Sequence, residues 1–269
     1  MMSSAFAFSL CIILVFCVLG GAAAQSDNPV TVTIIYDNTV FKEGLQADWG
    51  FSCLIEGMEK TILFDTGTQS DILLGNMAKL SIDPKNINDI VISHAHYDHT
   101  GGLAAILERN SNVTVWLPVS FPRDIFNIVE KAGAKVVRVK EPVEVCKDVF
   151  LTGEIDGGII EQALILETGS GSVLITGCAH PGIVDIVKKA EELRKRDLFF
   201  VFGGFHLTQT PEGNVREIVK AFQDLGVKYA GATHCTGEQA IGMFRLAYGD
   251  HFVQLGAGRI LSISSDGIK

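Results

Sequence analysis

One local pattern recurs four times along this chain and constrains its fold more than any other feature. A short apolar stretch ends in a turn that carries histidine, and a helix-like stretch follows. Ligands gather outside the carboxyl ends of strands in open α/β sheets, so we expect the four turns to converge on one rim. The turns contain residues 94–99, His180, His206 and His234.

Apolar periodicity and turn residues predict the elements between these turns. We expect strands near 31–37, 49–56, 60–65, 88–93, 113–117 and 135–138, with helices near 70–80, 101–109 and 123–132. Antiparallel strands are expected over 143–177, followed by strands at 172–177, 198–202 and 228–232 and helices at 183–195, 212–225 and 238–247. This order predicts two halves, each a sheet covered by helices.

Residues 1–24 differ from the rest of the 269-residue chain because they contain no Asp, Glu, Lys or Arg. An apolar run over 5–19 precedes small residues at 20–24, which is typical of a secretory signal peptide and its cleavage site. An uncleaved anchor helix is the alternative, but the run is short for a span of about 20 residues. We therefore expect cleavage near Ala24, one domain over 25–269, and a secreted or periplasmic protein without membrane attachment after cleavage.

The formal net charge of −9 lies entirely outside the predicted leader. An acidic protein repels polyanions, which argues against a nucleic-acid partner. A small anionic substrate is still compatible with this charge where a metal ion supplies local positive charge. The sequence does not predict an oligomeric state.

Four cysteines lie outside the leader: Cys53, Cys146, Cys178 and Cys235. Export permits disulfides, and four cysteines allow three pairings. Cys178 and Cys235 each lie within two residues of a candidate site histidine, which predicts that they are close in space. Their pairing stays open, because free cysteine often packs as a small hydrophobic residue.

Residues 94–99 hold three imidazoles and one carboxylate, the groups that bind zinc and its first-row neighbours. Such an ion lowers the pKa of bound water to about 7, and two ions that share one water lie roughly 3.5–4 Å apart. The alternative is a solvated polar loop, with other histidines merely satisfied at helix N-termini. A loop that turns after Tyr97 gives two ligand pairs and two further candidates: His94 with His96, Asp98 with His99, then His180 and His234.

The run His94-Ala95-His96-Tyr97-Asp98-His99, followed by Gly101-Gly102, resembles the H-x-H-x-D-H motif of the metallo-β-lactamase superfamily. The turn at 63–67 resembles that family's buried aspartate turn, which implies that Asp65 orients the metal loop. The resemblance covers nearly the whole chain after residue 24. It implies an α/β fold of the four-layer αβ/βα sandwich type, with the metal site at one edge between the two sheets.

The resemblance also implies a ligand set, in which His94, His96 and His180 hold one ion and Asp98, His99 and His234 hold the other. Most members have a bridging aspartate at the end of the strand between the third and last ligand histidines. Here that strand leads into residues 203–206, and His206 takes this neighbourhood. Its role is ligand, proton shuttle, oxyanion donor or plain backbone contact. The departure leaves open whether one ion or two bind.

Five further stretches resemble a narrower branch, the 7,8-dihydropterin-6-methyl-4-(β-D-ribofuranosyl)aminobenzene-5'-phosphate synthases. They are residues 36–38, 47–52, 176–182, 203–207 and 233–237. A leader sequence conflicts with a biosynthetic transfer on phosphorylated metabolites, which are not expected outside the cell. The synthase-like transferase is therefore an alternative rather than the first expectation.

The expected function is an exported metal-dependent hydrolase that uses metal-activated water on an ester, phosphoester or amide-like substrate. Asp98 and His206 are the predicted catalytic residues, while His251 lies outside any motif and is expected to be structural or on the surface. Zinc is the default ion, one or two per chain, with manganese(II) or iron(II) as alternatives for this mixed nitrogen and oxygen set. A non-catalytic small-molecule sensor is the remaining alternative.

Overall fold

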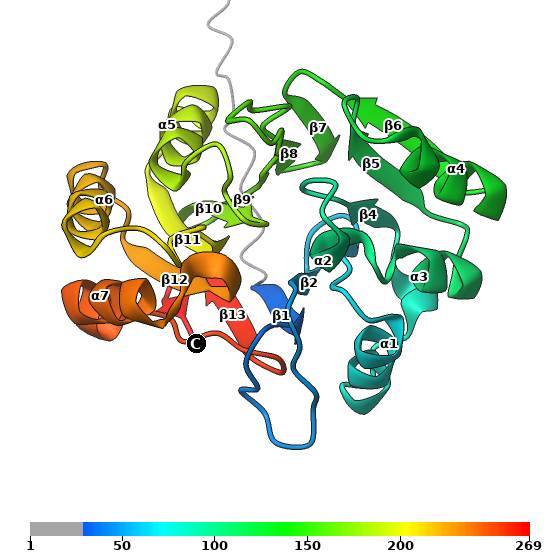
Figure 1. Ribbon diagram of the computed structural model, residues 1–269, viewed down its shortest axis with the longest axis horizontal. Coiled ribbons are helices and arrows are strands. Elements are labelled where there is room, and N and C mark those ends of the chain that lie inside the picture. Colours follow the sequence, from blue (N-terminus) through cyan, green and yellow to red (C-terminus); the bar gives the residue numbers. More distant parts are fainter. Residues whose placement is uncertain (1–28) are drawn as a thin grey trace, which may run out of the picture.

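The computed structural model describes residues 29–269, which form two β-sheets with helices on their outer faces (Figure 1). Residues 1–28 lie outside the described residues, and so does the predicted signal peptide. Within the described part, no helix combines the length and apolar character that a membrane span requires.

The first sheet has eight strands in the order β14-β13-β1-β2-β3-β4-β5-β6. Strands β3 to β6 run parallel, because the chain returns through a helical segment between each strand and the next. The strands are β1 (Val30–Tyr36), β2 (Ser52–Glu56), β3 (Ile62–Phe64), β4 (Asp89–Val91), β5 (Thr114–Pro118), β6 (Lys135–Val139), β13 (Ile260–Ser264) and β14 (Gly267–Ile268). The helical segments are α1 (Ser70–Lys79), the short η1 (Pro84–Asn86), α2 (Tyr97–Thr100), α3 (Leu103–Arg109) and α4 (Arg123–Ala132).

The second sheet has six strands in the order β12-β11-β10-β9-β8-β7. Its first four strands along the chain are antiparallel, as predicted for this region, whereas β10, β11 and β12 are parallel. The strands are β7 (Val143–Cys146), β8 (Val149–Leu151), β9 (Leu164–Thr168), β10 (Gly171–Thr176), β11 (Leu198–Gly204) and β12 (Tyr229–Thr233). The helices are α5 (Ile183–Arg194), α6 (Glu212–Asp224) and α7 (Glu238–Tyr248), with the short η2 (His234–Thr236) and η3 (Gly249–His251).

Three apolar clusters hold the layers together. One lies between the two sheets and contains buried side chains from both, including Phe64 of β3 and Phe202 of β11. A second joins α1, α3 and α4 to the outer face of the first sheet, and a third joins α5, α6 and α7 to the second. Figure 1 shows the same order of helices, sheet, sheet and helices. The predicted four-layer αβ/βα sandwich is confirmed.

Two features differ from the sequence-based expectation. The chain does not end in the second half, because β13 and β14 cross back and extend the first sheet beside β1. The apolar run at 49–56 forms a strand only from Ser52 onward. Gly50 stays in the preceding loop with a φ of +147°, and a Cβ there would lie 2.7 Å from the carbonyl oxygen of Asp98. The loop before β2 is therefore shaped by its contact with the histidine loop.

Candidate metal centre

Six of the seven histidines converge where strands β4, β10, β11 and β12 end. Three of them form one compact group. The Nδ1 atom of His96 lies 3.1 Å from Nε2 of His94 and 3.2 Å from Nε2 of His180. Burial lowers the pKa of His94 and His96, and it lowers the pKa of His180 to about 4. All three side chains are therefore neutral imidazoles at neutral pH, the form that binds metal ions.

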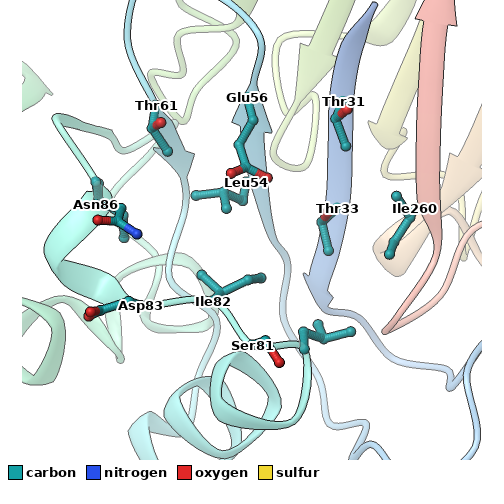
Figure 2. Close-up of a pocket in the computed structure, with 12 residues that line it drawn as sticks. Thr31, Thr33, Leu54, Glu56, Thr61, Ser81, Ile82, Asp83, Asn86 and Ile260 are labelled. Carbon is teal, nitrogen blue, oxygen red and sulfur yellow. The ribbon is translucent and has the colours of Figure 1, made fainter.

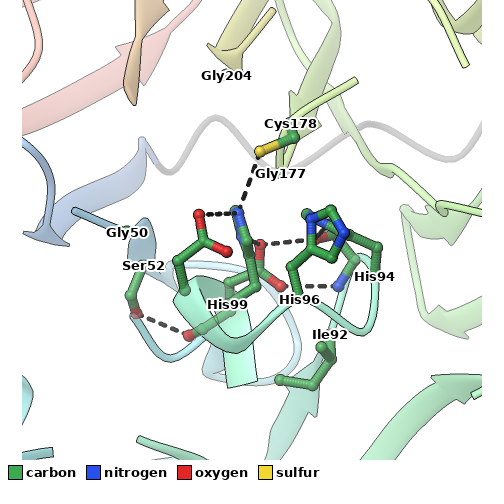
Figure 3. A network of polar contacts seen from close by, with 12 residues as sticks. Gly50, Ser52, Ile92, His94, His96, His99, Gly177, Cys178 and Gly204 are labelled. Carbon is green, nitrogen blue, oxygen red and sulfur yellow. Dashed lines mark hydrogen bonds and ion pairs between the residues drawn. The ribbon is translucent and has the colours of Figure 1, made fainter. Parts of the chain in front are cut away.

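A second group gathers four side chains from three loops. The Sγ atom of Cys178 lies 3.3 Å from Nε2 of His99 and 3.3 Å from Nε2 of His234. Asp98 Oδ2 lies 3.6 Å and 3.3 Å from the same two nitrogen atoms. Figure 3 shows Cys178 reaching from the end of β10 toward His99. Four ligand-type atoms, a sulfur, an oxygen and two nitrogens, thus face a common point.

Both groups have the dimensions that a divalent ion requires. Zinc bonds of 2.0–2.3 Å in tetrahedral geometry separate neighbouring ligand atoms by about 3.3–3.6 Å. The measured separations of 3.1–3.6 Å cluster around that range. The six ligands predicted from the sequence therefore fall into the two sets that the family resemblance implies. Their role as ligands stays a prediction, and Cys178 is an additional candidate.

Asp65 holds the histidine loop in place through three hydrogen bonds. Its carboxylate accepts hydrogen bonds from the backbone N–H of Ser93 at 2.7 Å, the Ser93 hydroxyl at 2.8 Å and Nδ1 of His99 at 2.7 Å. The Nδ1 bond leaves Nε2 of His99 facing the four-atom group. Burial opposes a charge on His99, but Asp65 and Asp98 outweigh it and raise the pKa of His99 to about 9. The local field therefore favours a cation, as a metal site requires.

Asn38 has the corresponding role for His234. Its Oδ1 atom accepts a hydrogen bond from Nδ1 of His234 at 2.9 Å and one from the backbone N–H of Gly50 at 3.1 Å. Its Nδ2 donates to the carbonyl oxygen of His234 at 3.1 Å. Neighbouring Asp37 accepts a hydrogen bond from the Thr233 hydroxyl at 2.7 Å, and burial raises its pKa to about 6. Residues 37 and 38, which lie in one of the stretches that resemble the family branch, therefore position the loop that carries His234.

Glu161 was not predicted from the sequence, yet it holds the loop that follows β10. Its fully buried carboxylate accepts four backbone N–H groups, each at 3.0 Å. Its Oε2 atom also lies 4.0 Å from Nδ1 of His94. Every partner of Glu161 in this loop is a backbone amide, so no side-chain motif marks the role in the sequence. The donors are the amides of Gly177, Cys178, Ala179 and His180.

Backbone strain concentrates around the same groups. Seven non-glycine residues among those described have a positive φ, and four of them belong to the centre. Each such residue costs about 1–3 kcal/mol and persists where the surroundings impose it, which is common at functional sites. The four are Asp65 (φ +56°), Ala179 (φ +63°), His206 (φ +53°) and His234 (φ +51°).

His206 lies beside the three-histidine group, exposed at the end of β11. Its ring centroid is 4.2 Å from that of His180, and its ring nitrogen groups with the thiols of Cys178 and Cys235. A hydrogen bond with Cys235 raises the pKa of His206. Burial opposes ionisation of Cys235, yet hydrogen bonds from Cys178 and His206 lower the pKa of its thiol. The predicted closeness of Cys178 and Cys235 is thus present, with all four described cysteines as free thiols.

A cavity of about 450 Å³ opens beside this centre. Trp49, whose side chain is 51% exposed, forms one wall and lies with its ring centroid 5.1 Å from that of His234. The full lining is Trp49, His206, Thr208, Gln209, Thr210 and Cys235. A smaller cavity of about 220 Å³ beside β1 and β2 has no histidine or cysteine in its wall (Figure 2). The larger one is therefore the candidate substrate pocket.

His251 lies apart from the centre, as expected. It is exposed on η3 and packs its ring 4.8 Å from that of Tyr229.

Comparison with known proteins now places this architecture in a family. The model of the metallo-beta-lactamase superfamily matches residues 50–191. The chain is 31% identical to the 7,8-dihydropterin-6-methyl-4-(beta-D-ribofuranosyl)-aminobenzene-5'-phosphate synthase of Methanocaldococcus jannaschii, over 87% of this chain and 97% of that protein. The chain belongs to the metallo-β-lactamase superfamily.

Solved structures agree with this assignment. A metal-dependent hydrolase of the beta-lactamase superfamily is 32% identical, with a TM-score of 0.74 over 87% of this chain and 99% of that one. The short form of human tRNase Z, at 14% identity and a TM-score of 0.59 over 87% of this chain and 99% of that one, shares the fold alone. These relatives are enzymes, and members of the superfamily typically bind metal ions.

Proposed function

We propose that this chain is a metal-dependent hydrolase that uses activated water on a small ester, phosphoester or amide-like substrate. The observation that carries the proposal is the pair of ligand groups with metal-site dimensions beside an accessible cavity of about 450 Å³. A divalent ion held by these residues would lower the pKa of bound water toward about 7 and so supply a nucleophile at neutral pH. Zinc is the first expectation for the ion.

Asp98 orients the attacking water in this proposal. Burial opposes ionisation of its carboxyl group, but the hydrogen bond from His234 and the charge of His99 hold the pKa of Asp98 well below its usual range. Asp98 is therefore a carboxylate anion at neutral pH and accepts a hydrogen bond. Such an acceptor, fixed on the one-turn helix α2, aligns a water molecule for attack.

His206 supplies the proton that the leaving group needs. It projects into the candidate pocket and is drawn toward its protonated form by Cys235. In hydrolysis the water oxygen forms a bond to the carbonyl carbon or phosphorus, and the bond to the leaving oxygen or nitrogen breaks. His206 donates its proton to that leaving atom, and the proton released by water restores the imidazolium.

The pocket chemistry favours a small, partly polar substrate. The lining includes the hydroxyl and amide groups of Thr208, Gln209 and Thr210 and the flat, largely apolar indole of Trp49. An anionic group is best accommodated next to the bound ion, because the protein itself carries a net charge of −9. The negative net charge also argues against a nucleic-acid substrate, because an acidic protein repels a polyanion. Export, with cleavage near Ala24, is part of the proposal and depends on the composition of residues 1–24.

The proposal is tested with the zinc-loaded protein on chromogenic phosphodiesters, phosphomonoesters, lactones, thioesters and amides. We expect turnover of at least one class, loss of that turnover after chelation, and recovery when zinc(II) is restored. Turnover that chelation leaves unchanged would contradict the proposal. Bound metal without turnover on any class would favour a sensor or a transferase instead.

Replacing His206 by alanine should lower kcat by about 10²-fold, the range expected for loss of a general acid. The bound ions should stay, because the two ligand groups of the proposal do not include His206. The measurements are kcat and KM on the best substrate, together with ion content. His251→Ala is the matched control and should leave both unchanged. Unaltered kcat in His206→Ala would show that this histidine is a spectator.

A transfer reaction is the second candidate, favoured by the 31% identity to a synthase over most of both chains. The ligand groups, Asp98 and His206 would have the same roles in a transfer reaction, in which an acceptor other than water takes the transferred group. Reaction in ¹⁸O-labelled water distinguishes the two, since a hydrolase places the label in its product and a transferase does not.

A further inference from the structure

We propose that the thiolate of Cys178 is the fourth protein ligand of the ion held by Asp98, His99 and His234. The resulting set of two nitrogens, one oxygen and one sulfur selects a thiophilic ion, zinc(II) over manganese(II). This inference rests on the proposed metal dependence and assigns a ligand that the family motif does not contain.

The first argument is geometric. Cys178 Sγ is 3.3 Å from each imidazole Nε2, and bond lengths of 2.3 Å for sulfur and 2.0–2.1 Å for nitrogen place tetrahedral ligands about 3.6 Å apart. A thiol that only filled space would have apolar neighbours. Instead, the sulfur faces the two nitrogens that also face Asp98.

The second argument concerns the orientation of the two rings. Nδ1 of His99 faces Asp65 and Nδ1 of His234 faces Asn38, so each ring turns its Nε2 atom toward the group. Two imidazole nitrogens, a carboxylate oxygen and a sulfur therefore lie within 4.8 Å of one another. These are the ligand types that a zinc ion binds when they are deprotonated.

The third argument is that the surrounding backbone fixes the position of Cys178 beside the two histidines. The carboxylate of Glu161 holds the Cys178 backbone, because its Oε1 atom accepts a hydrogen bond of 3.0 Å from the Cys178 N–H. The neighbouring strand β11 ends at Gly204, where a Cβ would lie 2.7 Å from Cys235 Sγ and 2.4 Å from the Gly177 carbonyl oxygen. There is therefore no room for a side chain at Gly204, where β11 ends beside the group.

Cys235 has a different position, although it lies next to Cys178. Its Sγ atom approaches the Cys178 carbonyl oxygen at 3.6 Å and groups with Cys178 and His206 beside the pocket, not with Asp98, His99 and His234. The two cysteines thus give a matched pair of variants: one removes the proposed ligand, and the other removes an adjacent thiol.

This assignment gives the two ligand groups different roles, one structural and one catalytic. Four protein ligands complete a tetrahedral set, which is typical of structural zinc, whereas three histidines leave one position for water or substrate. The reactive water would therefore lie at the group of His94, His96 and His180. Asp98 would hold the other ion through Oδ2, which faces His99 and His234, and this leaves Oδ1 to orient that water. An ion beside Cys178 would tie together the loops that follow β4, β10 and β12.

The test uses the full-length protein loaded with cobalt(II), which binds in zinc sites and reports thiolate ligation by a near-ultraviolet charge-transfer band. We expect the band in the unaltered protein with two ions per chain. Cys178→Ser should lose the band and one of the two ions, while Cys235→Ser should keep both. Circular dichroism confirms that each variant is folded.

Three outcomes would overturn the assignment: a band that survives in Cys178→Ser, a band lost only in Cys235→Ser, or two bound ions without any band. If Cys178→Ser does not fold, X-ray absorption at the zinc edge of the unaltered protein decides, because the assignment requires a sulfur neighbour. Failure of the proposed function has a separate signature, since the unaltered protein would then bind no ion at all.

Discussion

Asp98→Asn is expected to lower kcat/KM by about 10³-fold or more, the largest effect of any single substitution in this account. The amide keeps the shape of the side chain but removes the negative charge that holds a cation and orients water. The Asp98 oxygen lies 3.3 Å from His234 and 3.6 Å from His99, so the loss acts at the middle of the four-atom group. Steady-state kinetics and ion content are the two measurements.

Asp224→Asn is the control for this substitution. That carboxylate is exposed at the end of α6 and pairs only with Lys220 one turn away, a contact worth under about 1 kcal/mol. We expect it to leave both rate and ion content unchanged. If Asp98→Asn kept most of the activity with both ions bound, Asp98 would be neither ligand nor orienting group.

Glu161→Ala is expected to lower the free energy of unfolding by at least about 3 kcal/mol, because four backbone N–H groups, three of them buried, lose their acceptor. The loop that they fix carries both Cys178 and His180, so metal affinity should fall about 10- to 100-fold as well. Thermal unfolding and metal titration measure the two effects. A 3 kcal/mol loss corresponds to a Tm decrease of about 6–12 °C in a domain of this size.

Two further variants make this result specific. Glu161→Gln keeps the volume and one acceptor oxygen, so it should fall between the native protein and Glu161→Ala in both measurements. Glu130→Ala removes an exposed carboxylate on α4 and should change neither. Equal metal affinity in Glu161→Ala and the native protein would show that the loop holds its shape without this carboxylate.

The sequence predicted the site through residues that share one loop or repeat one pattern. Residues 94–99 indicate a metal site because four ligand-type side chains lie within six residues. His180, His206 and His234 each follow an apolar run that the sequence identifies as a strand. The order of strands and helices then brings these turns to one rim, because parallel strands end on the same side of a sheet. The four-layer fold itself followed from family resemblance rather than from periodicity.

Other parts of the centre depend on contacts that no local pattern encodes. Asn38 meets His234 across 196 residues, and Glu161 binds only backbone amides, so neither leaves a signal at the level of residue spacing. Cys178 is recognised as a candidate ligand only because its thiol lies beside two histidines that are 56 and 79 residues away in the sequence. Strand β13 was not predicted, because its alternation of apolar and polar residues covers only five positions and its pairing with β1 spans most of the chain.

The central claim is that the loops after strands β4, β10 and β12 together hold divalent metal ions. Mass-spectrometric metal analysis of the purified protein, before and after chelation, tests it most directly. We predict two zinc ions per chain, removed by the chelator and restored by zinc(II) together with turnover. A protein that contains no metal as purified, binds none on addition and behaves identically with and without chelator would contradict the claim.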